Sequence, residues 1–303
     1  MRVMTGMKSN PVAGTLWMLV TGLCFVAVTA LVKYLDNAVP AAEAAFLRYL
    51  LGLVFLVPMA KTLLATRMSR RQWSLFAARG GVHTLGVILW FFAMTRIPIA
   101  EVTAMNYLSP VYVTIAAALF LGETLAKRRI IAVAVALLGA LIILRPGFRE
   151  VNPGHLAMLG TAMLFAVSYL IAKIVADEVS PSMVVGMLSV TVTIGLAPFA
   201  FAVWVTPDLW TLLTCFGIAC FATGGHFAMT LAFRSAPLTV TQPVTFLQLV
   251  WAVLLGAVVF GEPVDPVVVL GGALILASVV FITLREAQLK RRAVTPGVNA
   301  PKT

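Results

Sequence analysis

Charged residues are scarce in this sequence. Asp, Glu, Lys and Arg make up 11% of its 303 residues, whereas soluble globular proteins contain about 25% charged residues. Hydrophobic residues make up 61%, and the mean hydropathy is +1.02. A chain of this composition cannot cover a soluble fold with a polar surface, so we expect its solvent to be the lipid bilayer.

Cysteine and histidine are also rare, with three of each. Cys24, Cys215 and Cys220 lie inside apolar runs, where a thiol behaves as a small hydrophobic group, so no disulfide framework is indicated. The sequence contains no phosphate-binding GxxxxGK[ST] loop, no metal-ligand set and no pair of mid-helix acids. We therefore predict no metal, no cofactor and no catalytic residues.

Apolar runs long enough to cross a bilayer recur along the whole chain. A helix needs about 20 residues to span a hydrocarbon core of about 30 Å. Runs of this length predict an all-α membrane protein with ten transmembrane helices, at residues 12–32, 40–60, 74–95, 98–120, 128–145, 156–175, 181–204, 209–232, 237–260 and 266–284.

The net charge of +11 is distributed unevenly between the loops. If the N-terminus is cytoplasmic, most Lys and Arg residues fall in cytoplasmic segments, among them Arg67, Arg70, Arg71, Arg79, Lys127, Arg128 and Arg129. Only Lys33, Arg96, Arg145 and Arg149 fall on the other side, and Arg48 lies within a helix. The positive-inside rule then predicts that both termini are cytoplasmic. Nucleic acid is not an expected partner, because no basic patch on a polar surface is indicated.

The two halves of the sequence match each other at a nearly constant offset. An offset of 140 pairs Lys33 with Lys173, and an offset of 139 pairs Pro98 with Pro237 and Glu123 with Glu262. A unit of five helices crosses the membrane an odd number of times, so its copy must enter from the opposite side. Inverted repeats of this kind are frequent among secondary transporters.

The repeat predicts the domain organisation. A short cytoplasmic tail at residues 1–11 precedes the first five-helix repeat at 12–145, and a linker at 146–155 leads to the second repeat at 156–284. The basic segment 285–303 has no apolar pattern, and we expect it to be a disordered cytoplasmic tail.

Three segments resemble the ten-helix EamA-type carriers of the drug/metabolite transporter superfamily. They are Leu108–Glu123 (LSPVYVTIAAALFLGE), its counterpart Leu247–Glu262 (LQLVWAVLLGAVVFGE) and Phe46–Leu50 (FLRYL). The resemblance covers residues 12–285 and extends to amino-acid exporters of the YddG type. It implies a bacterial inner-membrane carrier in which helices one, three and four face helices six, eight and nine around a central cavity. The second half departs from the first by placing Leu249 where Pro110 stands.

Polar side chains form two rows at equivalent positions of the repeats. They are Thr103, Asn106 and Ser109 in the fourth predicted helix, and Gln242, Thr245 and Gln248 in the ninth. Residues three or four apart share a helix face, and polar groups at bilayer depth need protein or water around them. The rows therefore predict either a substrate path or hydrogen bonds between helices.

Histidine and aromatic residues supply further candidates for substrate binding. His83 in the third predicted helix suits a substrate contact or a proton step, with helix packing as the alternative, and His226 is its weaker counterpart. Trp17, Tyr107 and Tyr169 lie on helices expected at the cavity and are predicted to line it, although membrane aromatics also pack or anchor at interfaces.

Arg48 is expected to have a structural role. It lies about 12 Å along the second predicted helix, where a charge needs a partner, and Glu43 or a backbone carbonyl could satisfy it.

These features together predict a secondary transporter that exports amino acids, including aromatic and other neutral ones, by alternating access. Because the central helices offer amides, hydroxyls and aromatic faces but few charges, zwitterionic or neutral metabolites are expected over sugar phosphates. The expected partners are this small-molecule substrate and the lipid bilayer, and the oligomeric state is not predicted. An intramembrane enzyme would need a catalytic cluster, and a scaffold or receptor would leave the paired polar rows unexplained.

Overall fold

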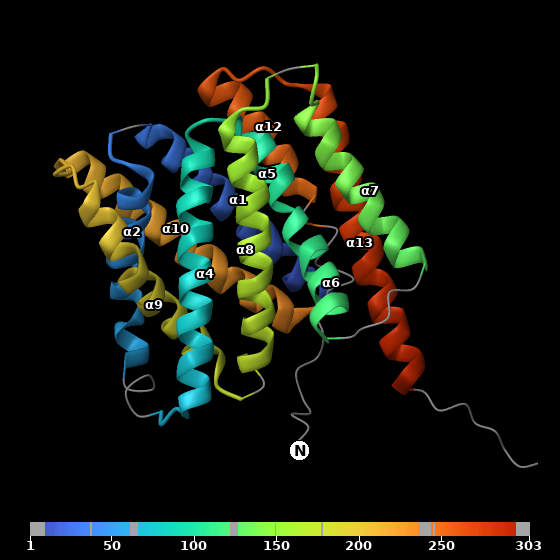
Figure 1. Cartoon of the computed structure of the whole chain (residues 1–303), viewed down its shortest axis with the longest axis horizontal. Coiled ribbons are helices and arrows are strands. Elements are labelled where there is room, and N and C mark those ends of the chain that lie inside the picture. Colours follow the sequence, from blue (N-terminus) through green and yellow to red (C-terminus); the bar gives the residue numbers. More distant parts are fainter. Residues whose placement is uncertain are drawn as a thin grey trace, which may run out of the picture.

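Helices stand side by side in one bundle in the computed structural model (Figure 1), which describes residues 10–36, 38–60, 66–121, 127–148, 150–176, 178–236, 244 and 246–294. The first half contains α1 (Pro11–Leu35), α2 (Ala41–Gly52), the 3₁₀ helix η1 (Leu53–Met59), α4 (Arg70–Met94), α5 (Ile99–Asn106), α6 (Leu108–Leu121) and α7 (Lys127–Leu144). The second half contains α8 (Pro153–Ala176), α9 (Pro181–Ala202), α10 (Leu209–Ser235), α12 (Phe246–Phe260) and α13 (Pro266–Val294).

The helices have the length and composition of membrane spans. Seven described helices, namely α1, α2 with η1, α4, α8, α9, α10 and α13, are long and apolar enough to cross a bilayer, and α12 is a shorter apolar helix. The fourth predicted span corresponds to α5 and α6, the fifth to α7 and the ninth to a segment ending in α12. The described helices therefore agree with the predicted all-helical fold of ten spans.

Helices of the two halves pack against each other reciprocally. The first helix of each half lies along the third helix of the other, because α1 packs on α10 and α8 packs on α4 (Figure 1). The second helices, α2 and α9, pack together, and so do the fifth helices, α7 and α13. Two inverted repeats are expected to pack in this reciprocal way, and both halves then surround the centre of the bundle.

Three helix boundaries differ from the sequence-based expectation. Helix α4 begins at Arg70 rather than 74, because Ser69 and Gln72 form a capping box at its start. The second span ends as a 3₁₀ helix that contains Pro58, which has no N–H to donate. The last helix runs to Val294, past the predicted end at 284, because the charged residues that follow are strong helix formers in water. The segment 285–294 is therefore helical, contrary to the expected disordered tail.

A matched pair of glycines tests the packing of α4 on α9. A Cβ added at Gly80 would lie 2.5 Å from the Cβ of Thr191, whereas one added at Gly81 would have no neighbour within 4 Å. We expect Gly80→Ala to lower the free energy of unfolding by about 1–3 kcal/mol through overpacking. Gly81→Ala should leave it unchanged or raise it by up to about 1 kcal/mol through helix propensity. Thermal unfolding in detergent measures both, and equal effects of the two substitutions would contradict the packing.

Candidate functional site

The fourth span is interrupted in its middle. Helix α5 ends at Asn106 and α6 begins at Leu108, so the unbroken helix predicted at 98–120 is wrong at this point. Pro110 explains the break, because it has no N–H for the carbonyl of Asn106 and its ring crowds that carbonyl. The N–H of Tyr107 instead donates to the carbonyl of Ala104 (3.3 Å). Broken helices of this kind form the substrate sites of many secondary transporters.

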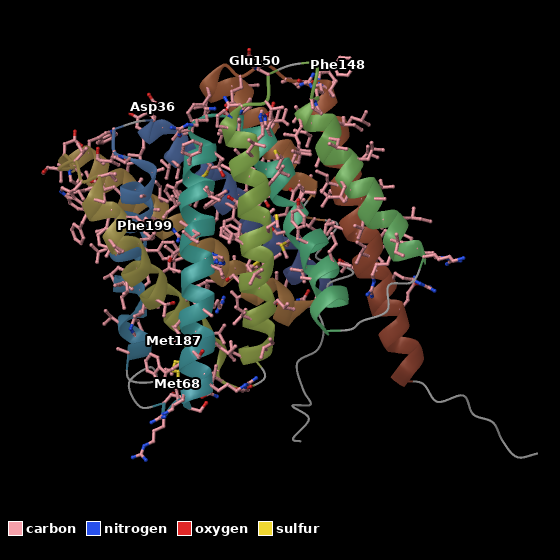
Figure 2. All side chains as sticks on the ribbon, in the orientation of Figure 1. Asp36, Met68, Phe148, Glu150, Met187 and Phe199 are labelled. Carbon is pink, nitrogen blue, oxygen red and sulfur yellow. The ribbon has the colours of Figure 1, made fainter. Side chains whose placement is uncertain are left out.

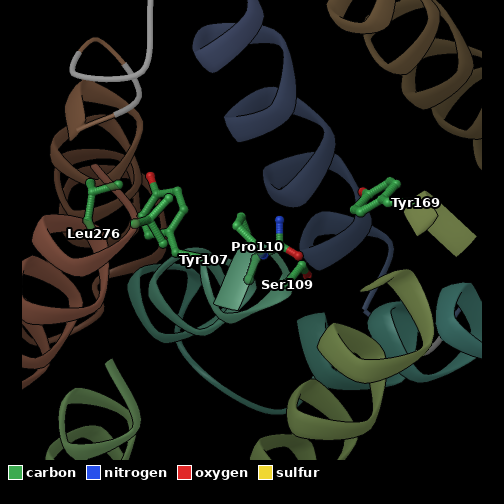
Figure 3. Close-up of a pocket in the computed structure, with 7 residues that line it drawn as sticks. Tyr107, Ser109, Pro110, Tyr169 and Leu276 are labelled. Atoms are coloured by element: carbon green, nitrogen blue, oxygen red, sulfur yellow. The ribbon is translucent and has the colours of Figure 1, made fainter. Parts of the chain in front are cut away.

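A cavity of ≈170 Å³ lies against this break, lined by Asn106, Tyr107, Ser109, Pro110, Tyr169, Leu276 and Val279. In Figure 3 Tyr107 and Leu276 lie on one side, Tyr169 on the other, and Ser109 and Pro110 between them. Both halves contribute, since Tyr169 belongs to α8 and Leu276 and Val279 belong to α13. Three residues predicted for substrate binding are thus brought together here, namely Asn106, Tyr107 and Tyr169.

The cavity wall combines polar and apolar groups. The Oδ1 atom of Asn106 and the Oγ atom of Ser109 are buried and have no hydrogen-bond partner among the described residues. Tyr169 is 44% exposed, although it lies on a helix packed inside the bundle. Leu276 and Val279 form the apolar side. Such a wall suits a small amphipathic molecule whose polar end meets α5 and α6.

His83 lies beside the cavity rather than in its wall. Its Nδ1 is 3.1 Å from the hydroxyl of Ser168, its Nε2 is 3.2 Å from the hydroxyl of Tyr49, and its ring stacks on Phe165 at 4.7 Å between centroids. His83 therefore joins α2, α4 and α8. It reaches the cavity through Phe165, whose ring centroid is 6.0 Å from that of Tyr169.

Trp17, Gln248 and Thr103, which the structure describes, do not line this cavity. Trp17 on α1 is 38% exposed, and Gln248 on α12 faces Gly22 of α1, whose added Cβ would lie 3.5 Å from that of Gln248. Thr103 is buried in α5. Gln242 and Thr245 lie outside the described residues.

The two arginines near the site differ from expectation. Arg79, assigned from the sequence to a cytoplasmic segment, is the tenth residue of α4, about 13 Å along the helix, and is 6% exposed. Arg48 and Glu43 form no ion pair in the described part of the chain. The Oε2 atom of Glu43 accepts a hydrogen bond from the N–H of Val205 (2.9 Å), and its Oε1 atom is buried without a partner among the described residues. The guanidinium of Arg48 lies 4.0 Å from the ring centroid of Tyr49.

Ion pairs join segments that are distant in the sequence at the end of the bundle where α5 begins. Glu262 pairs with Lys33 of α1 and also accepts a hydrogen bond from the N–H of Ile99 (3.0 Å), so it caps α5. His155 of α8 pairs with Glu101 of α5, and both side chains are 3% exposed. The sequence analysis placed His155 in a linker. The sequence signal for Glu262 is its match with Glu123, since both residues follow a glycine at the end of equivalent helices.

Comparisons with known proteins agree with this architecture. The model of the EamA-like transporter family matches residues 12–145 and 152–284. The chain is 30% identical to a riboflavin transporter of Vibrio cholerae, over 94% of this chain and 97% of that one. It is 31% identical to a riboflavin transporter of Rhizobium johnstonii, over 94% and 95% of the two chains. It is 26% identical to an S-adenosylmethionine uptake transporter of Rickettsia prowazekii, over 84% and 86% of the two chains.

Proposed function

Because the chain belongs to the EamA-like transporter family, we propose that it is a secondary transporter that moves a small organic metabolite through the cavity at the break of the fourth span. The observation that carries this proposal is the position of the break. Asn106 and Ser109, whose Oδ1 and Oγ atoms have no hydrogen-bond partner among the described residues, line a cavity between two inverted halves. Alternating access requires a site that either half can open to its own side of the membrane.

The shape of the cavity wall bears on the substrate. Tyr107 and Tyr169 offer aromatic faces, α5 and α6 offer hydrogen-bonding groups, and α13 offers an aliphatic wall. Two candidate substrates follow. Neutral amino acids, with an aromatic or aliphatic side chain, are the class that the sequence predicts. Riboflavin is the second candidate, because two relatives at 30% and 31% identity are riboflavin transporters.

A flux experiment with purified protein in liposomes tests the proposal. Labelled phenylalanine, riboflavin and S-adenosylmethionine are loaded inside or supplied outside, because the sequence predicts export whereas one relative is an uptake transporter. We expect at least one of them to equilibrate faster than in protein-free liposomes, with saturation as its concentration rises. If none of the three moves faster in either direction, the proposed function is wrong for these substrate classes.

The orientation in the inner membrane is proposed from the charge distribution. Met68 and Phe148 lie at opposite ends of the bundle (Figure 2), and Phe148 is 92% exposed. In a variant without native cysteines, Phe148→Cys should react with an impermeant thiol reagent in intact cells. Met68→Cys and Gln288→Cys should be protected until the cells are opened. Labelling of both of these positions in intact cells would reverse the orientation.

A further inference from the structure

Two arginine side chains lie buried inside the bundle near the cavity. Arg79 is 6% exposed and Arg48 is 9% exposed. Arg79 donates from Nη1 to the carbonyl of Val184 (2.9 Å), but its Nε is buried and has no partner in the described ranges. Arg48 has its contact with the face of Tyr49, which leaves its five N–H donors without an acceptor among the described residues.

Neither guanidinium has a counter-charge among the residues that the structure describes. Within the part of the chain that the structure describes, the ion pairs join other residues, and Glu43, on the same helix as Arg48, is engaged with the backbone of Val205. A charge inside the membrane is costly unless it is paired, and buried charges without a structural partner mark substrate or ion pathways. Two such buried cations point to an anion that binds during the working cycle.

Accessible side chains connect these arginines to the cavity. The guanidinium of Arg48 lies 4.0 Å from the ring centroid of Tyr49, and the hydroxyl of Tyr49 is 3.2 Å from Nε2 of His83. Arg79 lies four residues before His83 on α4, and the ring of His83 stacks on Phe165, which is next to Tyr169. Tyr169 lines the cavity (Figure 3), and His226 is exposed although it lies in the middle of α10. A series of side-chain contacts through Tyr49, His83 and Phe165 therefore connects the arginine-bearing helices α2 and α4 to Tyr169 in the cavity wall.

We propose that Arg48 and Arg79 form a subsite for the carboxylate of the transported metabolite, while its apolar or aromatic body lies against Tyr169 and the cavity wall. This inference rests on the proposed transport function. A guanidinium presents parallel N–H donors that match the two oxygens of a carboxylate. The transporter then selects metabolites that carry a carboxylate over neutral molecules of the same shape.

The subsite changes the expected selectivity. With Arg48 as the one mid-membrane charge, the sequence predicts zwitterionic or neutral substrates over strongly charged ones such as sugar phosphates. With Arg79 also inside, the carboxylate of a neutral amino acid has a counter-charge, whereas riboflavin has no carboxylate to place there.

The experiment compares two probes that differ only in charge, indole-3-acetate and its neutral amide, indole-3-acetamide. Their affinities for the purified full-length protein are measured by ligand-induced thermal shift in detergent, a readout that does not depend on transport. We expect the acid to bind the unaltered protein at least about 10-fold more tightly than the amide. Arg79→Gln and Arg48→Gln should each weaken binding of the acid by about 10-fold or more and leave binding of the amide unchanged.

Control variants separate charge from folding. Arg96→Gln removes an arginine that lies over the ring of Phe92 and is exposed, and it should leave both affinities unchanged. If the glutamine variants do not fold, Arg79→Lys and Arg48→Lys replace them. These variants keep the positive charge and should retain part of the preference for the acid.

Equal affinities for the acid and the amide, including no binding of either, would overturn the subsite. Competition by inorganic phosphate alone at the same concentration as the acid would also overturn it, because the arginines would then bind any anion. If the acid is preferred as expected but no substrate moves in liposomes, the subsite stands and the transport function fails.

Discussion

Replacing Asn106 with alanine is expected to reduce transport about 10- to 100-fold while leaving the yield and stability of the protein unchanged. Asn106 lines the cavity, and its buried Oδ1 accepts no hydrogen bond from the described residues, so the substitution removes no protein hydrogen bond at that atom. A hydrogen bond to a polar substrate would be lost, and an unmade bond inside a site costs about 1–3 kcal/mol. The initial rate of substrate flux per milligram of reconstituted protein measures the effect.

Asn152→Ala provides a control with the opposite profile. Asn152 accepts a hydrogen bond from the N–H of Gly154 (2.8 Å) at the start of α8, away from the cavity. Its loss should lower the unfolding temperature, as the loss of a helix cap typically costs about 1 kcal/mol, and leave flux per folded molecule intact. If Asn106→Ala transports normally, or if it loses stability as Asn152→Ala does, the cavity is not the substrate site.

The number and positions of the spans could be predicted because each span carries its own signal. Hydropathy over about 20 residues marks a helix in lipid without reference to the rest of the fold. Averaging hydropathy over about 20 residues does not detect the break at Tyr107, because Leu108 and Val111 continue the apolar run on both sides of Pro110. The predicted third span at 74–95 already contained Arg79, but the count of charges on each side of the membrane placed Arg79 among the cytoplasmic residues.

The candidate site could be predicted only in part. The three-residue spacing in the fourth span predicts a common face for Asn106 and Ser109, and the structure places both at the cavity together with Tyr107 and Tyr169; their role in substrate binding stays a prediction. Contacts between helices carry no such local signal. The repeat matches Glu262 with Glu123 but does not show that Glu262 caps α5, at Ile99, 163 residues away in the sequence.

The buried pair of His155 and Glu101 offers the largest expected effect on stability. It joins α5 of the first half to α8 of the second, and each side chain is 3% exposed. Removing one partner of a buried pair leaves a desolvated polar group behind, and this typically costs about 3–5 kcal/mol. Replacing both partners with apolar residues of similar volume is often neutral. The pair should therefore show strong coupling between its two positions.

We expect His155→Leu to lower the free energy of unfolding by about 3–5 kcal/mol, because it leaves the carboxyl group of Glu101 buried without this partner. Glu101→Leu should cost less, since an imidazole is more easily buried in its neutral form than a carboxylate is in its charged form. The double variant should recover most of the loss, and a double-mutant cycle from thermal unfolding in detergent yields the coupling energy. Strictly additive losses would mean that the two side chains do not stabilise each other, and that the halves are held together at this end by Glu262 and its contacts with Lys33 and Ile99.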